Sequence, residues 1–244
     1  MSIPTIDIAP YLDGSNKKDV AAQINKACEE IGFFMIKGHG ISLDLLQNVQ
    51  TASKTFFDLP LETKLETQAP FGLGYMGVGK ENVAATLEEG SQVKDYKESL
   101  NITMPVRDTV WPKDEELRTK CNAYYEAVQN LSSQLMRLFA LALEQEEHFF
   151  DDKVDNAFTV LRMLNYPEFE VKETQTKNDE DLDIDTRNAE HTDYGTLTVL
   201  WSSDSRGLQA RSRSGEWIDV VAPSDQFIIN IGDLMMNWTN DKWV

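Results

Sequence analysis

The sequence is poor in cysteine, histidine and basic residues. Its 244 residues include 2 cysteines and 3 histidines, and 41 Asp and Glu outnumber 23 Lys and Arg, for a formal net charge of −18. A chain this acidic would repel another polyanion, so we expect no nucleic-acid partner. The two thiols, Cys28 and Cys121, lie in helical patterns and favour a reducing compartment over a disulfide scaffold.

Long apolar runs are also absent. No segment approaches the roughly 20 apolar residues that cross a bilayer. The N-terminal residues lack the charged leader and apolar block of a signal peptide. We therefore predict a cytoplasmic protein without a membrane partner. We also expect a monomer. A hydrophobic fraction of 41% is still ample for a large buried core.

Local patterns predict a mainly helical first half. Residues 3–8 alternate apolar and polar, which suits a short edge strand, and residues 33–36 are typical of a buried strand. Between them, apolar residues recur at helical spacing up to Gly32, placed as a C-cap glycine. Ser42 is placed to cap a second helix, and the longest helical pattern covers residues 112–147.

Residues 68–110 are irregular and dotted with glycine. They predict a loop over an active site, although a solvated connection explains the pattern almost as well. A strand is expected at 158–166, followed by an acidic connection at 168–190. That connection lacks the glycine and the closing glutamate of an EF-hand, so we interpret it as a solvated loop.

Short segments with turn signals between them follow. Their spacing is near the 8 to 12 residues expected of antiparallel β-structure, and it indicates a sandwich or barrel. The strands are predicted at residues 191–201, 207–210, 217–221 and 227–231.

The three histidines differ in context. His39 lies between two glycines and fits a turn, and His148 ends the long helical pattern, where the helix dipole favours an imidazolium. His191 opens a predicted strand, and Asp193 follows two positions later. Residues two apart on a strand point the same way, so this imidazole and carboxylate would supply two neighbouring ligands of iron(II). Acidic residues are so common that about one histidine in six has such a neighbour by chance.

Seven motifs, one of which contains His191 and Asp193, occur in order along nearly the whole chain. They are IPTIDIAPYL, CEEIGFFMIKGHGI, SKTFFDLPLETK, LRMLNYP, HTDYGTLTVL, GLQARSRSGEWIDV and NIGDLMMNWTND. Together they resemble the isopenicillin N synthase-like branch of the iron(II)/2-oxoglutarate dioxygenases. The resemblance implies an α+β fold, a double-stranded β-helix (jelly-roll) with flanking helices.

The resemblance also implies site residues and cofactors. His191 and Asp193 match the family's HxD metal ligands, and Tyr166 matches a tyrosine that hydrogen-bonds 2-oxoglutarate. The implied cofactor is Fe(II), with 2-oxoglutarate as co-substrate, O2 and a small-molecule substrate; no residue is assigned as a catalytic acid or base. Tyr166 would otherwise be a strand-end side chain packed on the core. Thr196 and Leu197 are expected to line the barrel, and residues 232–233 to form a turn.

The resemblance suggests three regions. Residues 1–110 would form the N-terminal dioxygenase region, 111–152 a long bracing helix, and 153–244 the jelly-roll core. In the family, a third histidine ligand and an arginine and serine that clamp 2-oxoglutarate follow the NIGDLMMNWTND segment. The chain carries neither after that segment, so we expect an incomplete jelly-roll without its last strands, inactive as the 244-residue fragment.

Three functions are considered. The first is an oxygenase that couples decarboxylation of 2-oxoglutarate to hydroxylation, desaturation or cyclisation of a small molecule; a variant without 2-oxoglutarate is a subclass of it. The second is a truncated, non-catalytic jelly-roll that binds a small molecule or a partner. The third, a sugar-binding or storage-type barrel in the second half, has little support, because the HxD pair and the helical first half would then need separate explanations.

Overall fold

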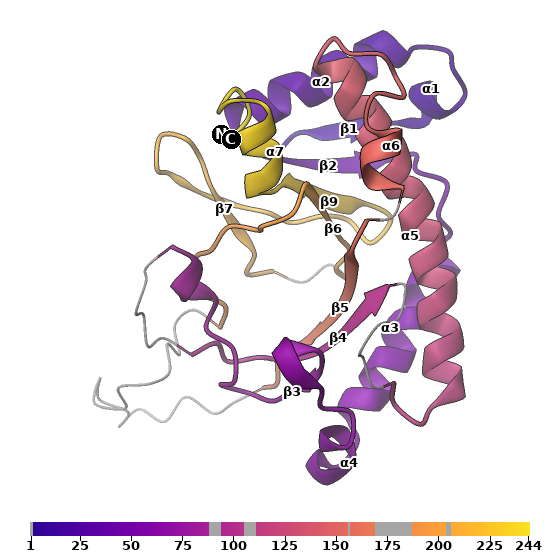
Figure 1. Ribbon diagram of the computed structural model, residues 1–244, viewed down its shortest axis with the longest axis vertical. Coiled ribbons are helices and arrows are strands. Elements are labelled where there is room, and N and C mark those ends of the chain that lie inside the picture. Colours follow the sequence, from indigo (N-terminus) through magenta and orange to yellow (C-terminus); the bar gives the residue numbers. More distant parts are fainter. Residues whose placement is uncertain (1, 88–93, 105–110, 156, 169–186, 204–205) are drawn as a thin grey trace. The chain divides into compact units, whose positions relative to one another are not determined.

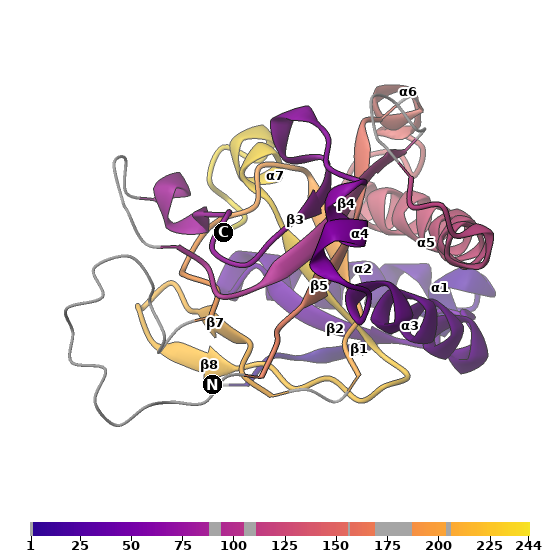
Figure 2. The same ribbon diagram turned by 90° about the horizontal axis from the view of Figure 1, so that it is seen from below.

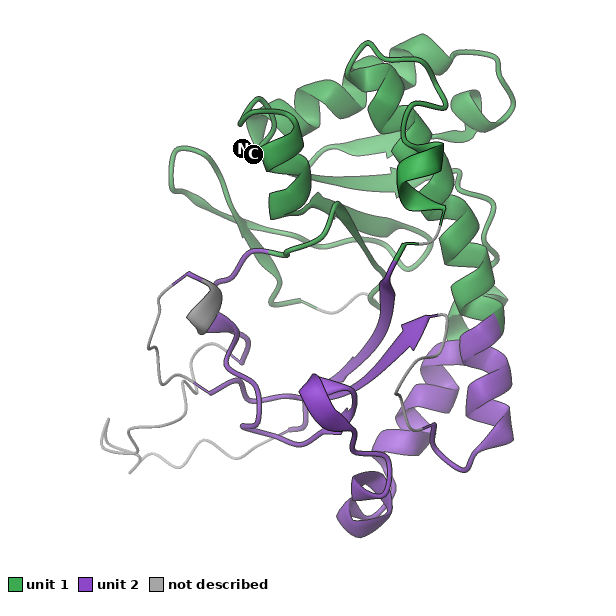
Figure 3. Ribbon diagram, in the orientation of Figure 1, with its two compact units in different colours: residues 1–47, 123–157, 193–244 green, residues 48–122, 158–192 purple. Residues whose placement is uncertain are grey.

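The computed structural model describes residues 2–87, 94–104, 111–155, 157–168, 187–203 and 206–244 (Figure 1). These residues form two compact units, coloured separately in Figure 3. Unit 1 consists of Met1–Gln47, Ala123–Ala157 and Asp193–Val244, and unit 2 consists of Asn48–Asn122 and Phe158–Thr192. Helices and mainly antiparallel strands occur together, as expected of the predicted α+β class.

Unit 1 contains a four-stranded mixed sheet with the order β1-β2-β9-β6. Strand β1 (Thr5–Asp7) lies at the edge and is parallel to β2 (Phe33–Lys37). Strand β9 (Phe227–Ile231) pairs antiparallel with both β2 and β6 (Leu197–Leu200). The predicted edge strand and the predicted buried strand of the first half are both confirmed, and β9 is buried at every position.

Most of the helical side chains in the main core of unit 1, which also includes residues of this sheet, come from two helices. These are α2 (Lys17–Glu30) and the C-terminal part of α5 (Glu115–Ala142). Helix α2 ends as predicted, because Gly32 follows its last turn at a φ of +76° that side chains rarely adopt. The long helical pattern corresponds to α5. The described cysteines are free and buried, one in each of these helices.

Shorter elements complete unit 1. Strands β7 (Gln209–Arg211) and β8 (Trp217–Asp219) form an antiparallel hairpin, seen in Figure 2. Its apolar side chains join a second core cluster with Ile228 of β9. The remaining helices are α1 (Ala9–Leu12), α6 (Asp151–Val154) and α7 (Asp233–Trp238).

Unit 2 contains the three-stranded antiparallel sheet β3-β4-β5. Its strands are β3 (Gly74–Met76), β4 (Glu98–Met104) and β5 (Thr159–Asn165). Helix α4 (Leu61–Leu65) follows Pro60, and short 3-10 turns cover Pro70–Gly72 and Val83–Thr86. Helix α3 (Leu43–Phe57) has residues 43–47 in unit 1 and its remainder in unit 2. It begins after Ser42, whose hydroxyl accepts a hydrogen bond from the Leu45 N–H at 3.3 Å, so the predicted cap is confirmed.

The expectation that residues 68–110 are wholly irregular is wrong. The segment supplies β3 and β4, and β4 is buried along its whole length. Polar residues on β4, including Glu98 and Asn101, conceal the apolar pattern of a strand. They are accommodated because both have partners elsewhere in unit 2: Lys64 Nζ donates to the Glu98 carboxylate, and the Asn101 amide donates to the Gly72 carbonyl.

Three further expectations change. The strand predicted at 191–201 is only β6, so His191 and Asp193 lie in a segment before it. The predicted turn at 232–233 is the start of helix α7, with Gly232 as N-cap. Most of the acidic connection lies outside the described residues. Among the described helices, none has both the length and the apolar character needed to cross a membrane.

Candidate functional site

The His191 side chain belongs to unit 2 and is exposed. Its Nδ1 lies 2.8 Å from the Ala189 carbonyl oxygen. A carbonyl can only accept a hydrogen bond, so a neutral imidazole here carries its proton on Nδ1 and its lone pair on Nε2. Metal-binding histidines commonly use this arrangement, in which one ring nitrogen donates to a carbonyl and the other faces the metal.

The Asp193 carboxylate belongs to unit 1 and is half-buried. Its Oδ2 accepts a hydrogen bond from the Thr198 hydroxyl at 2.5 Å and one from the Asn230 amide at 2.8 Å. Thr198 and Asn230 are direct partners in the register of β6 and β9. Two neighbouring strands therefore present two donors at one carboxylate oxygen and fix its orientation.

Backbone contacts hold the segment that follows Asp193 against the start of α7. The Asp233 N–H donates to the Asp193 carbonyl at 2.7 Å, and the Gly232 N–H donates to the Thr196 carbonyl at 3.1 Å. A Cβ on Gly232 would lie 2.2 Å from the carbonyl oxygen of Gly195. The glycine is needed here for close approach of two backbones, a role that the sequence interpretation as a turn missed.

The structure also changes the basis of the HxD prediction. Neither His191 nor Asp193 lies on a strand, so the rule that alternate strand residues share a face does not apply to them. The residues that orient each side chain do occur in the motifs quoted above. Thr198 stands in HTDYGTLTVL and Asn230 in NIGDLMMNWTND, but their bonds to the carboxylate depend on strand register.

Tyr166 is the residue after β5 and its side chain is 38% exposed. Burial of the phenol raises its pKa, and the negative charges of Asp95 and Glu81 act in the same direction, whereas nearby arginines oppose it. Tyr166 is therefore protonated at neutral pH and is able to donate a hydrogen bond, the property that its predicted cofactor role requires.

The other two histidines have structural partners. His39 Nε2 lies 2.9 Å from the Asp225 carbonyl, and its Nδ1 accepts the Ile41 N–H at 3.1 Å. His148 Nδ1 lies 2.8 Å from an Asp151 carboxylate oxygen. These contacts support the interpretation of both as structural residues. Within the described part of the chain, no group of three or more His, Cys, Asp or Glu is placed to hold a metal.

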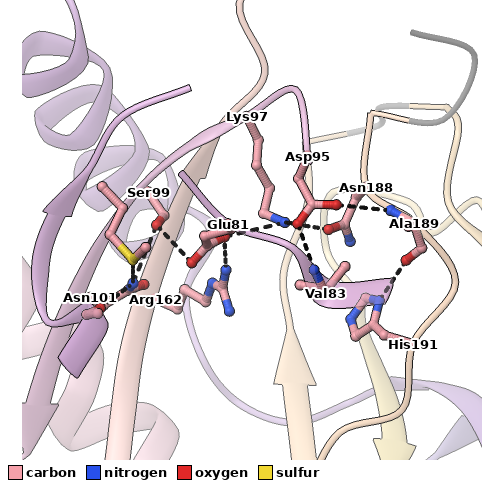
Figure 4. A network of polar contacts seen from close by, with 12 residues as sticks. Glu81, Val83, Asp95, Lys97, Ser99, Asn101, Arg162, Asn188, Ala189 and His191 are labelled. Carbon is pink, nitrogen blue, oxygen red and sulfur yellow. Dashed lines mark hydrogen bonds and ion pairs between the residues drawn. The ribbon is translucent and has the colours of Figure 1, made fainter. Parts of the chain in front are cut away.

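A buried pair of charges, which the sequence interpretation missed, lies close to His191 in unit 2 (Figure 4). Asp95 is 0% exposed and Lys97 is 2% exposed, and their charged groups are 2.9 Å apart. The Asp95 carboxylate also accepts the Val83 N–H at 3.0 Å and the Ala189 N–H at 3.2 Å. No local sequence signal indicated it, because an acid and a lysine two residues apart are ordinary in an acidic chain.

Two family models match the chain. Residues 3–124 match a model described as the N-terminal region of non-haem dioxygenases in morphine synthesis, and residues 158–243 match the 2OG-Fe(II) oxygenase superfamily. The chain belongs to this superfamily. It is a 2-oxoglutarate- and Fe(II)-dependent dioxygenase, which uses O2 and a small-molecule substrate, and its fold is the family's jelly-roll.

Individual proteins support this assignment. The chain is 33% identical to the 2-oxoglutarate-Fe(II) type oxidoreductase hxnY of Emericella nidulans, over 98% of this chain and 72% of that protein. It is 31% identical to the clavatol oxidase claD of Penicillium crustosum, over 99% of this chain and 78% of that protein. The crystal structure of a full-length Neurospora crassa protein in complex with alpha-KG and thymine aligns with a TM-score of 0.83 at 31% identity, over 99% of this chain and 77% of that one.

The described residues fit the donor chemistry that such a dioxygenase needs. A histidine with its lone pair on Nε2 and a carboxylate oriented by two donors are both ligands that suit Fe(II). The family assignment by itself names no residue, so the ligands rest on these two environments.

Proposed function

We propose that His191 and Asp193 bind the Fe(II) ion of this dioxygenase and that Tyr166 hydrogen-bonds its 2-oxoglutarate. The observation that carries the proposal is the orientation of the Asp193 carboxylate by Thr198 and Asn230. A surface carboxylate needs no such support, whereas metal-binding carboxylates are commonly held by neighbouring donors.

In the proposed reaction, the residues of the chain hold and orient the metal and 2-oxoglutarate. The Ala189 carbonyl keeps the His191 proton on Nδ1, so that Nε2 is the nitrogen offered to the metal. The protonated Tyr166 hydroxyl would donate a hydrogen bond to 2-oxoglutarate. Bound Fe(II), 2-oxoglutarate and O2 supply the oxidising chemistry, in which 2-oxoglutarate is decarboxylated to succinate.

We propose hydroxylation, desaturation or cyclisation of a small molecule as the outcome. The similar proteins are named for different compounds, such as clavatol, and one was crystallised with thymine. This diversity is consistent with a shared metal site and separate substrate contacts, so no single substrate is carried over to this chain.

The metal proposal is tested by titrating the protein with Mn(II), a redox-inactive substitute for Fe(II). Electron paramagnetic resonance measures the concentration of free Mn(II). We expect His191→Ala to weaken binding at least tenfold, because one of the proposed ligands is removed. His148→Ala is the matched control, since His148 pairs with Asp151 in a structural contact, and it should leave the affinity unchanged. Equal affinity in all three proteins would refute the metal site and favour the alternative, a non-catalytic jelly-roll that binds a small molecule or partner.

We also propose that the protein is a cytoplasmic monomer without nucleic-acid or membrane partners. We further propose that its regions are residues 1–110, 111–152 and 153–244. The high net negative charge supports the absence of a nucleic-acid partner. Sedimentation velocity checks the oligomeric state, and limited proteolysis checks the boundaries.

A further inference from the structure

The buried pair Asp95–Lys97 contacts Asn188 and Ala189, which lie shortly before His191 in the sequence (Figure 4). Asp95 Oδ1 accepts the N–H of Ala189 at 3.2 Å. Lys97 Nζ donates to the side-chain oxygen of Asn188 in a short hydrogen bond. One charged pair therefore holds two consecutive residues, one by its backbone and the other by its side chain.

Ala189 links this pair to His191. Its N–H donates to Asp95, and its carbonyl accepts the hydrogen bond from His191 Nδ1 at 2.8 Å. The position of this carbonyl determines which ring nitrogen carries the proton and how the ring is turned. Displacement of the Ala189 main chain would therefore change both the tautomer and the orientation of the His191 ring.

The pair is well suited to hold a fixed position. Both side chains are almost completely buried, and Lys97 Nζ also lies 3.2 Å from the Glu81 carboxylate. Glu81 in turn pairs with Arg162 of β5. The four charges balance, and each buried ion has more than one partner, which is the condition under which a buried ion pair is tolerated.

We propose that Asp95 is a positioning residue for His191, acting through the main chain of Ala189, with Lys97 holding both Asp95 and Asn188. The proposal rests on the proposed function, in which His191 binds the metal. It predicts that the ionic pair sets the tautomer of the proposed ligand, in addition to any contribution to folding.

The first measurement is a long-range ¹⁵N–¹H spectrum of the histidine side chains without metal. Only three histidines occur in the sequence, so His191 is assigned from His191→Gln. The wild type should show the Nδ1–H form. Asp95→Ala should shift the ring toward the Nε2–H form, and Asp95→Asn should restore part of the wild-type signal because it keeps an oxygen opposite the Ala189 N–H.

Asn188→Ala is the second variant, because it leaves the ion pair between Asp95 and Lys97 in place and is expected to fold. It should show a smaller shift in the same direction. Glu98→Ala is the matched control: Glu98 is 5% exposed and pairs with Lys64 at 2.7 Å, so its removal also breaks a buried ion pair of unit 2. It should leave the His191 tautomer unchanged.

The second measurement is the Mn(II) titration of the same proteins. Asp95→Ala should weaken binding about tenfold, the low end of the range for groups that support a metal-binding histidine, and Glu98→Ala should change it less than twofold. An unchanged tautomer and unchanged affinity in Asp95→Ala, with Mn(II) still broadening the His191 signals, would overturn the positioning role alone. Failure of Mn(II) to broaden the His191 signals in the wild type would overturn the proposed function. An equal loss of Mn(II) affinity in Glu98→Ala would show that Asp95 and Lys97 contribute only to folding, and would also overturn the positioning role.

Discussion

Gly232 is the position where one added methyl group should disturb the proposed ligand Asp193 most directly. The φ of Gly232 is −104°, which any residue can adopt, so Gly232→Ala introduces no backbone strain of its own. The new Cβ would instead lie 2.2 Å from the carbonyl oxygen of Gly195 and 2.6 Å from that of Asp193. Both neighbours are main-chain atoms, which cannot turn aside as a flexible side chain can.

The free energy of unfolding should fall by about 1.5–3.5 kcal/mol. Overpacking of this kind costs about 1–3 kcal/mol. If one of the hydrogen bonds between the two segments is lost, such as Asp233 N–H to Asp193 O at 2.7 Å, about 1 kcal/mol more is lost. The stiffer unfolded chain returns roughly 0.5 kcal/mol. Because the Asp193 backbone must move, Mn(II) affinity should fall as well.

Urea unfolding followed by circular dichroism measures the first effect, and Mn(II) titration measures the second. Gly195→Ala is the matched control, because a Cβ on Gly195 has no neighbouring atom within 4 Å. It should be neutral or slightly stabilising. A Gly232→Ala variant within about 0.5 kcal/mol of the wild type would refute the steric argument, as would an equally large loss in Gly195→Ala.

Two further predictions concern hydrogen-bonded carboxylates. Thr198→Val removes the hydroxyl that donates to Asp193 and should weaken Mn(II) binding about tenfold, whereas Thr198→Ser should retain it; equal affinities in a parallel titration would contradict the role of the hydroxyl. Hydrogen bonds from Arg137 and then His148 lower the pKa of Asp151 from 3.8 to about 2. The folded state binds this proton less readily than the unfolded state, so the stabilisation is present above pH 3.8 and is lost as the pH falls towards 2. Acid unfolding curves should therefore be shallower in this range for Asp151→Asn than for the wild type, and superimposable curves would show that the interaction contributes nothing.

The sequence predicted the elements whose signals are local. The helix that ends before Gly32, the cap at Ser42 and the long helix α5 each depend on spacing or on a single residue at an element's end. The same holds for the buried strand β2. Such signals act within a few residues, and they can be recognised before any long-range contact is known.

Strand β4 and the beginning of β6 were not predicted correctly, for related reasons. Polar residues of β4 are buried because groups distant in the sequence bond to them, as Lys64 does to Glu98 across 34 positions. Residues 191–196 lead directly into the apolar pattern of β6 and were therefore included in its strand. The backbone carbonyls of Asp193, Gly195 and Thr196 instead accept hydrogen bonds from residues 232–234 at the start of α7. In both places a long-range contact overrides the local pattern.

In the candidate site, too, some features follow from the local sequence and others from long-range contacts. The sequence alone determined the two candidate ligands, His191 and Asp193, because residue type and motif order are properties of the chain. Only the tertiary structure supplied what orients them: Asn230 lies 37 positions from Asp193, and Asp95 lies 94 positions from Ala189. A hydrogen bond depends on distance and angle in space, and over separations of this length those quantities are set by strand register and burial.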